Sequence, residues 1–264
     1  MKILAIGDPH GRLDKIKKIP FEDIELILLT GDIGNADLAR KFYMDNFDRQ
    51  SKGLPELKLS DSMRRKMYLE TYRSATSVVR YLSKQAPVYL VSGNADYDNY
   101  YVRKFSQKIG MNLPVMMNEL RAIKGVRVIN NQLANFNGIR IGGLEYFVDT
   151  SWVRDFAPND KNRIKEAKFE TQKARRVLVK FDDVDILLCH QPPYGILDKV
   201  SFKGARKAWH GKHAGSKVIL DFVKRKKPDY VFCGHIHEGE GFRKVGRTKV
   251  YNLGVAGYKI IHFN

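Results

Sequence analysis

ILAIGDPHG, residues 3–11, is the stretch that says most about how this chain folds. Four apolar residues run without a break, and Asp8 and His10 follow them within a glycine- and proline-containing turn. A continuous apolar run of this length is typical of a β-strand that is covered on both faces. Open α/β sheets bind their ligands beyond the carboxyl ends of such strands. The stretch therefore predicts a buried strand that leads directly into a functional loop.

Four further apolar runs repeat this design along the chain. Each run leads into a polar cluster: residues 26–29 into TGDIGN, 88–91 into SGNAD, 186–189 into HQPP, and 230–233 into GHIH. Glycine and proline mark the strand exits, as they do in many turns. All five polar clusters thus fall at the carboxyl ends of predicted strands, where we expect the site to lie.

Helical patterns fill the gaps between these strands. The spacing of apolar residues predicts helices over 61–84, 97–109, 160–179 and 215–227, the last capped by Ser216 or Gly215. Further strands are predicted over 126–130, 139–143, 243–253 and 258–263, with a hairpin at Gly246-Arg247. The alternation of strands and helices predicts one layered α/β domain over residues 1–264. Two helices fit within residues 36–86, either as a cap over the site or as a structural insertion.

The composition is that of a globular protein with a large excess of positive charge. Apolar residues make up 43 %, charged residues 29 %, and the net charge is +18. Such a charge attracts polyanions, and half of it lies in residues 199–227, either as a substrate-facing surface or as a solvated face. No apolar run reaches the ~18 residues of a membrane span. With no secretory signal pattern at the N-terminus, we expect a cytoplasmic protein without membrane contact, with Cys189 and Cys233 as buried thiols.

Seven side chains of the polar clusters are candidate metal ligands. They are Asp8, His10, Asp32, Asn94, His190, His235 and His237. Asp8 and His10 are two residues apart on an extended strand exit, so both can reach one ion, and His235 and His237 repeat that spacing. This mixed nitrogen and oxygen set favours Mn²⁺, Fe, Zn²⁺ or Ni²⁺ over Ca²⁺. Two such ions about 3.5–4 Å apart can hold a phosphate and activate water for in-line attack.

In the order and type of its motifs, the chain resembles the calcineurin-like metallophosphoesterases. The motifs are DPHG at 8–11, GDIGN at 31–35, GNAD at 93–96, HQPP at 190–193 and GHIH at 234–237. HQPPYGILD at 190–198 is similar to the branch that contains the metallophosphoesterase-domain (MPPED) proteins. The resemblance implies a four-layer α/β/β/α sandwich. It also implies that Asp8, His10, Asp32 and His237 hold one ion and that Asp32, Asn94, His190 and His235 hold the other. Of the metals that suit this donor set, we expect Mn²⁺ first.

The third motif departs from the family's usual GNH[DE], because Ala95 stands where the family has histidine. In the family, that histidine is taken to protonate the leaving group or to bind the phosphate. A methyl group can do neither, and loss of a general acid typically lowers the rate ~10²–10⁴-fold. Ala95 therefore argues against efficient hydrolysis of monoesters with poor leaving groups. We hypothesise that His213 or His210, in the basic segment, replaces the missing acid.

The sequence thus predicts a dinuclear phosphodiesterase that acts on a phosphorylated small molecule or nucleotide. A metal-bound hydroxide would attack in line, and Asp32, Asn94 and His213 are the residues assigned to catalysis. The positive charge leaves a nuclease on DNA or RNA as the first alternative, which would lose affinity steeply with salt. A non-catalytic scaffold on the same fold is the second alternative.

Overall fold

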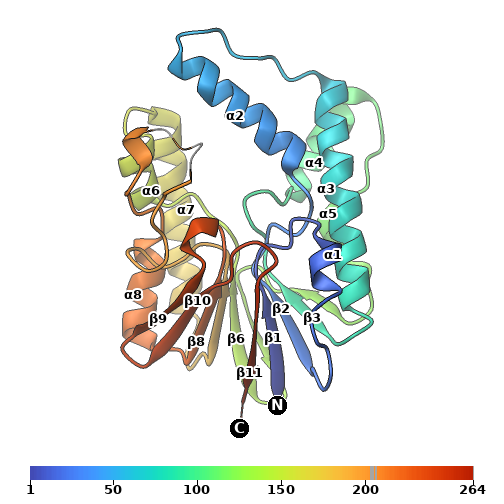
Figure 1. The fold of residues 1–264 in the computed structure, drawn as a ribbon, viewed down its shortest axis with the longest axis vertical. Coiled ribbons are helices and arrows are strands. Elements are labelled where there is room, and N and C mark those ends of the chain that lie inside the picture. Colours follow the sequence, from blue (N-terminus) through green and yellow to red (C-terminus); the bar gives the residue numbers. More distant parts are fainter. Residues whose placement is uncertain (203–204, 206, 264) are drawn as a thin grey trace.

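The computed structural model describes residues 1–202, 205 and 207–263, and it places two β-sheets face to face between layers of helices (Figure 1). The first sheet has the order β11-β1-β2-β3-β4. Its strands are β1 (Lys2–Ile6), β2 (Leu26–Leu29), β3 (Val88–Leu90), β4 (Val126–Val128) and β11 (Tyr258–His262). β1 to β4 are parallel, and β11 pairs antiparallel with β1 at the edge, with Ile3 opposite Ile261.

The second sheet has the order β5-β6-β7-β8-β10-β9. Its strands are β5 (Gln132–Phe136), β6 (Ile139–Leu144), β7 (Ile186–Cys189), β8 (Tyr230–Cys233), β9 (Gly241–Val245) and β10 (Thr248–Asn252). The four central strands are parallel, and the antiparallel strands β5 and β9 form the two edges. β9 and β10 form the predicted hairpin, in which Val245 pairs with Thr248 around Gly246-Arg247.

Helices cover the outer face of each sheet, which confirms the predicted four-layer α/β/β/α sandwich. On the first sheet lie α1 (Leu13–Ile16), α3 (Asp61–Leu82) and α5 (Met116–Ala122), with α4 (Asn99–Ile109) packed beside α3. On the second sheet lie α7 (Lys161–Val179) and α8 (Lys217–Lys226), with α6 (Thr150–Phe156) against α7. None of the helices in the described part of the chain combines the length and apolar character that crossing a membrane requires.

The continuous apolar runs are explained by the two cores that each strand faces. In β2, Ile27 and Leu29 pack under the helices, whereas Leu26 and Leu28 pack between the sheets. Successive side chains of a strand point to opposite faces, so a strand that is covered on both sides needs apolar residues at every position. The same packing fixes the strand register and, with it, the place where each polar cluster begins.

The predicted helices and strands are present, with ends that differ by a few residues. Ser216, rather than Gly215, caps α8, because its hydroxyl accepts a hydrogen bond from the Ile219 N–H at 3.2 Å. The structure adds β5 and the short helices α1, α5 and α6, which the apolar spacing does not predict. Cys189 and Cys233 are free buried thiols, as predicted.

One helix stands apart from these layers. α2 (Asp37–Ser51) belongs to the 36–86 segment and lies above the ends of the strands (Figure 1). It starts beside the Asp32 loop, and near its far end the ring of Phe47 lies 5.9 Å from that of Trp209, on the second-sheet side. α2 thus reaches across the top of the molecule from one sheet toward the other.

Candidate metal centre

The seven predicted ligands meet where strands of both sheets end. Asp8 and His10 follow β1, Asp32 follows β2, and Asn94 follows β3. His190 follows β7, and His235 and His237 follow β8. The first sheet therefore supplies the carboxylates and the amide, and the second sheet supplies three of the four imidazoles. Neither sheet alone carries the whole set.

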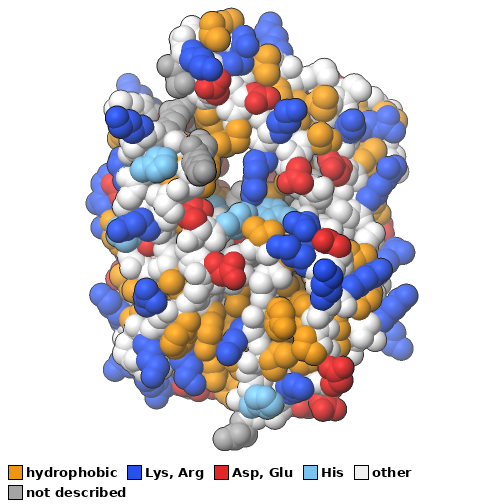
Figure 2. All heavy atoms as spheres, in the orientation of Figure 1, with side chains coloured by type: hydrophobic (Ala, Val, Ile, Leu, Met, Phe, Trp, Pro, Cys, Tyr) orange, Lys and Arg blue, Asp and Glu red, His pale blue; other side chains and the backbone are white. Residues whose placement is uncertain are grey.

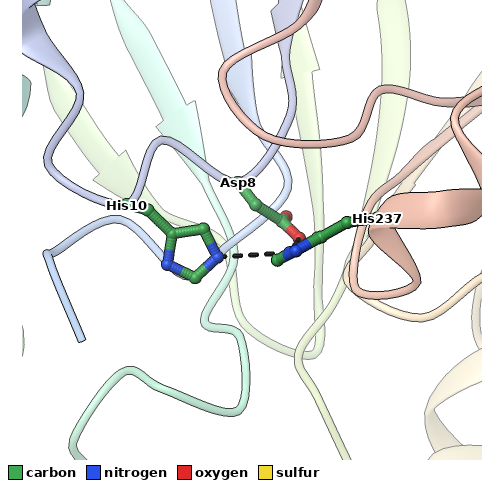
Figure 3. Close-up of side chains that lie close together, drawn as sticks. All are labelled: Asp8, His10 and His237. Atoms are coloured by element: carbon green, nitrogen blue, oxygen red, sulfur yellow. Dashed lines mark hydrogen bonds and ion pairs between the residues drawn. The ribbon is translucent and has the colours of Figure 1, made fainter. Parts of the chain in front are cut away.

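One group of ligand atoms is formed by Asp8, His10 and His237 (Figure 3). The two Nε2 atoms of the histidines are 3.2 Å apart. Oδ2 of Asp8 lies 3.4 Å from Nε2 of His237. Three electron-rich atoms that converge from two strand exits form a pocket that suits a divalent cation.

A second group is formed around the side-chain oxygen of Asn94. This Oδ1 lies 2.9 Å from Nε2 of His190 and 2.8 Å from Nδ1 of His235. The other ring nitrogen of His190, Nδ1, lies 3.0 Å from the carbonyl oxygen of Thr30. A proton on Nδ1 would donate to that carbonyl, and Nε2 would then present a lone pair toward Asn94. This is the arrangement in which protein histidines hold a metal.

Asp32 lies between the two groups. Its Oδ2 is 3.7 Å from Nε2 of His10, and its Oδ1 is 3.7 Å from Nε2 of His190. The backbone N–H of Ala95 also donates to Oδ1 at 2.7 Å, which fixes the carboxylate plane. Because each oxygen faces a different group, the geometry suits a carboxylate that is shared between two ions. The full donor set of imidazole nitrogens and carboxylate or amide oxygens fits divalent transition metals.

The backbone is strained at three of the candidate ligands. His10, Asp32 and His235 have φ values of 43°, 45° and 68°, in the left-handed region that residues other than glycine seldom adopt. Gly234 has no room for a side chain, because a Cβ atom there would lie 2.1 Å from Oδ1 of Asp8. Packing of the core strands that flank these turns keeps the three residues in backbone conformations that would be unfavourable in isolation.

Hydrogen bonds from neighbouring groups hold the buried carboxylates in place. The Thr30 hydroxyl donates to Oδ1 of Asp8 at 2.7 Å, and the backbone N–H of His235 donates to Oδ2 at 2.5 Å. Asp96 accepts the N–H groups of Gly93 and Ile33 at 2.8 and 3.1 Å, so it ties the third loop to the second. Burial, together with the charge of Asp32, raises the pKa of Asp96 to about 7.

The environment keeps two of the imidazoles neutral. Burial lowers the pKa of His10, and burial together with the charge of His190 lowers the pKa of His235 to about 3. At His190 burial acts in the same direction, but the carboxylates of Asp32 and Asp8 outweigh it and raise its pKa to about 9. Metals bind the neutral imidazole, so His190 has to release a proton when an ion binds.

His213 lies outside this cluster. Its Nδ1 is 2.6 Å from Oδ1 of Asp198, and its ring contacts Tyr194. Asp198 is buried and also accepts the N–H groups of Gly195 and Gly215, each at 2.9 Å. Within the described residues, no hydrogen bond or ion pair joins His213 to any of the seven candidate ligands.

His210, the other candidate for the missing acid, is exposed. Its Nε2 lies 3.2 Å from the carbonyl oxygen of Ala205. Of the two histidines, only His213 has a carboxylate partner in the described part of the chain. This difference distinguishes His213, which the sequence analysis assigns to catalysis, from His210.

Two cavities open beside the Asn94 loop. One, of about 290 Å³, is lined by His10, Asp32, Ala36, Ala39, Arg40, Tyr43, Asn94, Ala95, Asp96 and Tyr97. The other, of about 730 Å³, includes Asn94 and Tyr146, whose ring lies 5.8 Å from that of His190 and 5.5 Å from that of His235. Figure 2 shows histidine side chains at the bottom of a hollow in this face, with Lys or Arg side chains beside them.

The motifs do not predict Tyr146 or Arg40 as residues of the site. Tyr146 follows β6, so the rule that polar residues behind a strand form the site applies to it as well. Arg40 lies within α2, in a segment without a motif, and no feature of the sequence indicates that it lines a cavity with His10.

A two-sheet sandwich with clustered His, Asp and Asn side chains at its strand ends defines a protein of the metallophosphoesterase class. The chain belongs to the calcineurin-like phosphoesterase family, whose sequence model matches residues 1–239. This confirms the resemblance that the five motifs carry.

Curated relatives agree with this assignment. UPF0046 protein T07D4.2 of Caenorhabditis elegans is 24 % identical over 263 residues, which are 96 % of this chain and 55 % of that protein. The chain thus spans about half the length of that relative. Human metallophosphoesterase domain-containing protein 1 is 39 % identical over 75 residues, which are 28 % of this chain and 21 % of that protein. The MPPED-like character that the motifs indicate is therefore confirmed.

Solved structures share the fold at low sequence identity. A dimetal phosphatase from Danio rerio covers 97 % of this chain and 88 % of its own, with a TM-score of 0.50 and 10 % identity. Another crystal structure covers 98 % of this chain and 94 % of its own, with a TM-score of 0.64 and 17 % identity. At these identities the likeness establishes the sandwich fold alone.

Proposed function

We propose that this chain is a dinuclear metal-dependent phosphodiesterase. The observation that carries the proposal is the position of Asp32, whose two oxygens each lie 3.7 Å from a histidine of a different ligand group. Membership of the phosphoesterase family supports hydrolysis of a phosphoric ester. Two divalent ions, when bound, would supply Lewis acidity to the phosphate and activate water for in-line attack.

The residues of this chain would position and neutralise the reacting groups. His10 and His235 are held neutral by burial and are thereby ready to bind cations. Asn94 would be an oxygen ligand between two imidazoles, and the Ala95 N–H would keep the Asp32 carboxylate in the bridging orientation. Fixed groups of this kind need no reorganisation during the reaction. Such positioning and electrostatic preorganisation are the main source of catalysis in phosphoryl transfer.

A preference for diesters follows from Ala95. Its methyl group lines the 290 Å³ cavity next to Asp32, so this position offers neither a proton nor a positive charge. A monoester dianion carries more negative charge than a diester and gains more from a histidine at this point. Without that histidine, the pocket favours the singly charged diester, on a small molecule or a nucleotide.

We also propose that His213 donates the proton to the leaving group. Its hydrogen bond with the buried carboxylate of Asp198 fixes Nδ1, so that Nε2 remains available on a side chain with 35 % exposure. A carboxylate that orients an imidazole is a recurring arrangement in acid–base catalysis. Comparing esters with good and poor leaving groups in a His213 variant tests this role.

The experiment that tests the main proposal is a panel of purified-protein assays with Mn²⁺, Ni²⁺, Zn²⁺ and Mg²⁺. The substrates are an aryl phosphodiester, its monoester, cyclic nucleotides and single-stranded DNA. We expect metal-dependent hydrolysis, highest with Mn²⁺, with the diester cleaved faster than the monoester. Faster cleavage of the monoester would overturn the diester preference. Cleavage of long DNA with a steep loss of affinity in salt would favour the nuclease alternative instead.

A further inference from the structure

Arg40 of α2 lines the same 290 Å³ cavity as the candidate ligands His10 and Asp32. It approaches them from the helix that lies above the strand ends (Figure 1). A guanidinium group therefore faces the site from outside the two sheets.

Arg40 has no opposite charge to neutralise it within the described part of the chain. None of the ion pairs or hydrogen bonds between described residues involves its guanidinium group. An arginine on an exposed helix commonly pairs with a nearby carboxylate. Here the planar group, with five donors, stays available for a ligand that enters the cavity.

Contacts at the two ends of α2 explain its position above the site. None of its described side chains is buried, so packing into the core does not explain its place. At its start, the Asn35 side chain accepts the N–H of Asp37 at 2.8 Å, and the Thr71 hydroxyl donates to the Asn35 carbonyl at 2.8 Å. Near its other end, Phe47 contacts Trp209. These contacts hold the helix across the site and aim the Arg40 face at the cavity.

The chemistry of the cavity identifies the ligand class. Its floor carries His10 and Asp32, its wall carries the methyl group of Ala95, and Arg40 adds a positive charge on the α2 side. Arginine binds phosphate through two parallel hydrogen bonds. We propose that Arg40 binds the two non-bridging phosphoryl oxygens of the substrate and provides the anion-binding role that Ala95 does not. This inference rests on the proposed phosphoesterase function and names one residue that selects the substrate.

The first test measures binding of inorganic phosphate to the Mn²⁺-loaded full chain by isothermal titration calorimetry. We expect Arg40→Ala to weaken phosphate binding about 10- to 100-fold, as for other lost charged hydrogen bonds. Arg40→Lys keeps the charge but not the two parallel hydrogen bonds, so its affinity for phosphate should lie between those of the wild type and Arg40→Ala. Lys41→Ala is the matched control, since it removes the same charge from the adjacent, exposed position of α2 and does not line the cavity. Equal affinities for Arg40→Ala and Lys41→Ala would overturn the inference.

A second test separates this inference from the proposed function. Manganese content should stay at the wild-type level in Arg40→Ala, because the change lies outside the ligand set. Ala95→His should then restore more activity in the Arg40→Ala background than it adds to the wild type, because both positions line one cavity. Equal gains in the two backgrounds would overturn the inference that Arg40 takes the role of a histidine at position 95. The proposed function would still stand, because the wild type would still hydrolyse its substrate. Absence of metal-dependent hydrolysis in the wild type would instead defeat the proposed function itself.

Discussion

The floor of the site and its rim are built in opposite ways. On the floor, Asp8, Asp32 and His190 are buried behind core strands, and each is held by hydrogen bonds. On the rim, Tyr43 on α2 is 53 % exposed, and the side chain of His213 is 35 % exposed. Buried polar groups require partners, whereas exposed ones do not, so the floor tolerates far less change.

This contrast between floor and rim suits a division between chemistry and selectivity in this molecule. A floor on strand ends holds its groups within a rigid core, as metal coordination requires. A rim on α2 and on the segment after His190 can change in sequence without disturbing that core, as is general for loops over a scaffold. We therefore propose that the floor carries the metal chemistry and that the rim recognises the ester.

The largest effect should come from Asp32→Ala, which removes a carboxylate whose two oxygens lie beside histidines of different ligand groups. We expect loss of both ions and of activity to below the detection limit, with metal content measured by plasma mass spectrometry. Asp221→Ala, an exposed acid on α8, is the control. If Asp32→Ala kept two ions per chain, Asp32 would not be the shared ligand and the floor would not be a single unit.

A narrower change, His235→Ala, should separate the two ligand groups. His235 contacts Asn94 in the second group, whereas the first group of Asp8, His10 and His237 keeps all of its side chains. We therefore expect the metal content to fall from two ions to about one, with activity lowered by several orders of magnitude. Loss of both ions would mean that the groups bind metal only together.

The sequence predicts the floor of the site better than its rim. The floor is predictable because each ligand comes directly behind an apolar run, and packing between two cores fixes where that run ends. The family resemblance also predicts that Asp32 is shared between two ions. The left-handed backbone at His10 and His235 is not predicted, since tertiary packing overrides the preference of these residues.

The rim is much less predictable from the sequence. From the sequence, residues 36–86 are read as a structural insertion in preference to a cap. Nothing in the periodicity of α2 shows that Arg40 lines a cavity with His10. The contact of Phe47 with Trp209 joins residues that are far apart in the chain. Likewise, the sequence does not predict that Asp198 pairs with His213, because this contact forms only when the segment after His190 folds back on itself. Such contacts depend on loop geometry, which apolar patterns do not encode.

On the rim, His213→Phe tests the proposed proton donor. We expect turnover of an alkyl diester, which needs a protonated leaving group, to fall at least about 100-fold, the lower end of the range for a general acid. An aryl diester should fall much less, and His210→Phe should leave both rates near the wild-type level. Equal losses on both esters would indicate that His213 supports the fold of its segment through Asp198 and does not supply a proton.

The smallest change that we predict is a gain from Ala95→His. The backbone N–H of this residue holds Asp32 in any variant, so the substitution adds an imidazole to the cavity without removing a floor contact. We expect turnover of the aryl monoester to rise about tenfold, below the full effect of an optimised acid, while the diester rate changes little. The ratio of the two rates, measured with the same metal, is the informative quantity, because an altered metal content would move both rates together. An unchanged ratio would show that the preference for diesters is set elsewhere on the rim and not by the missing histidine.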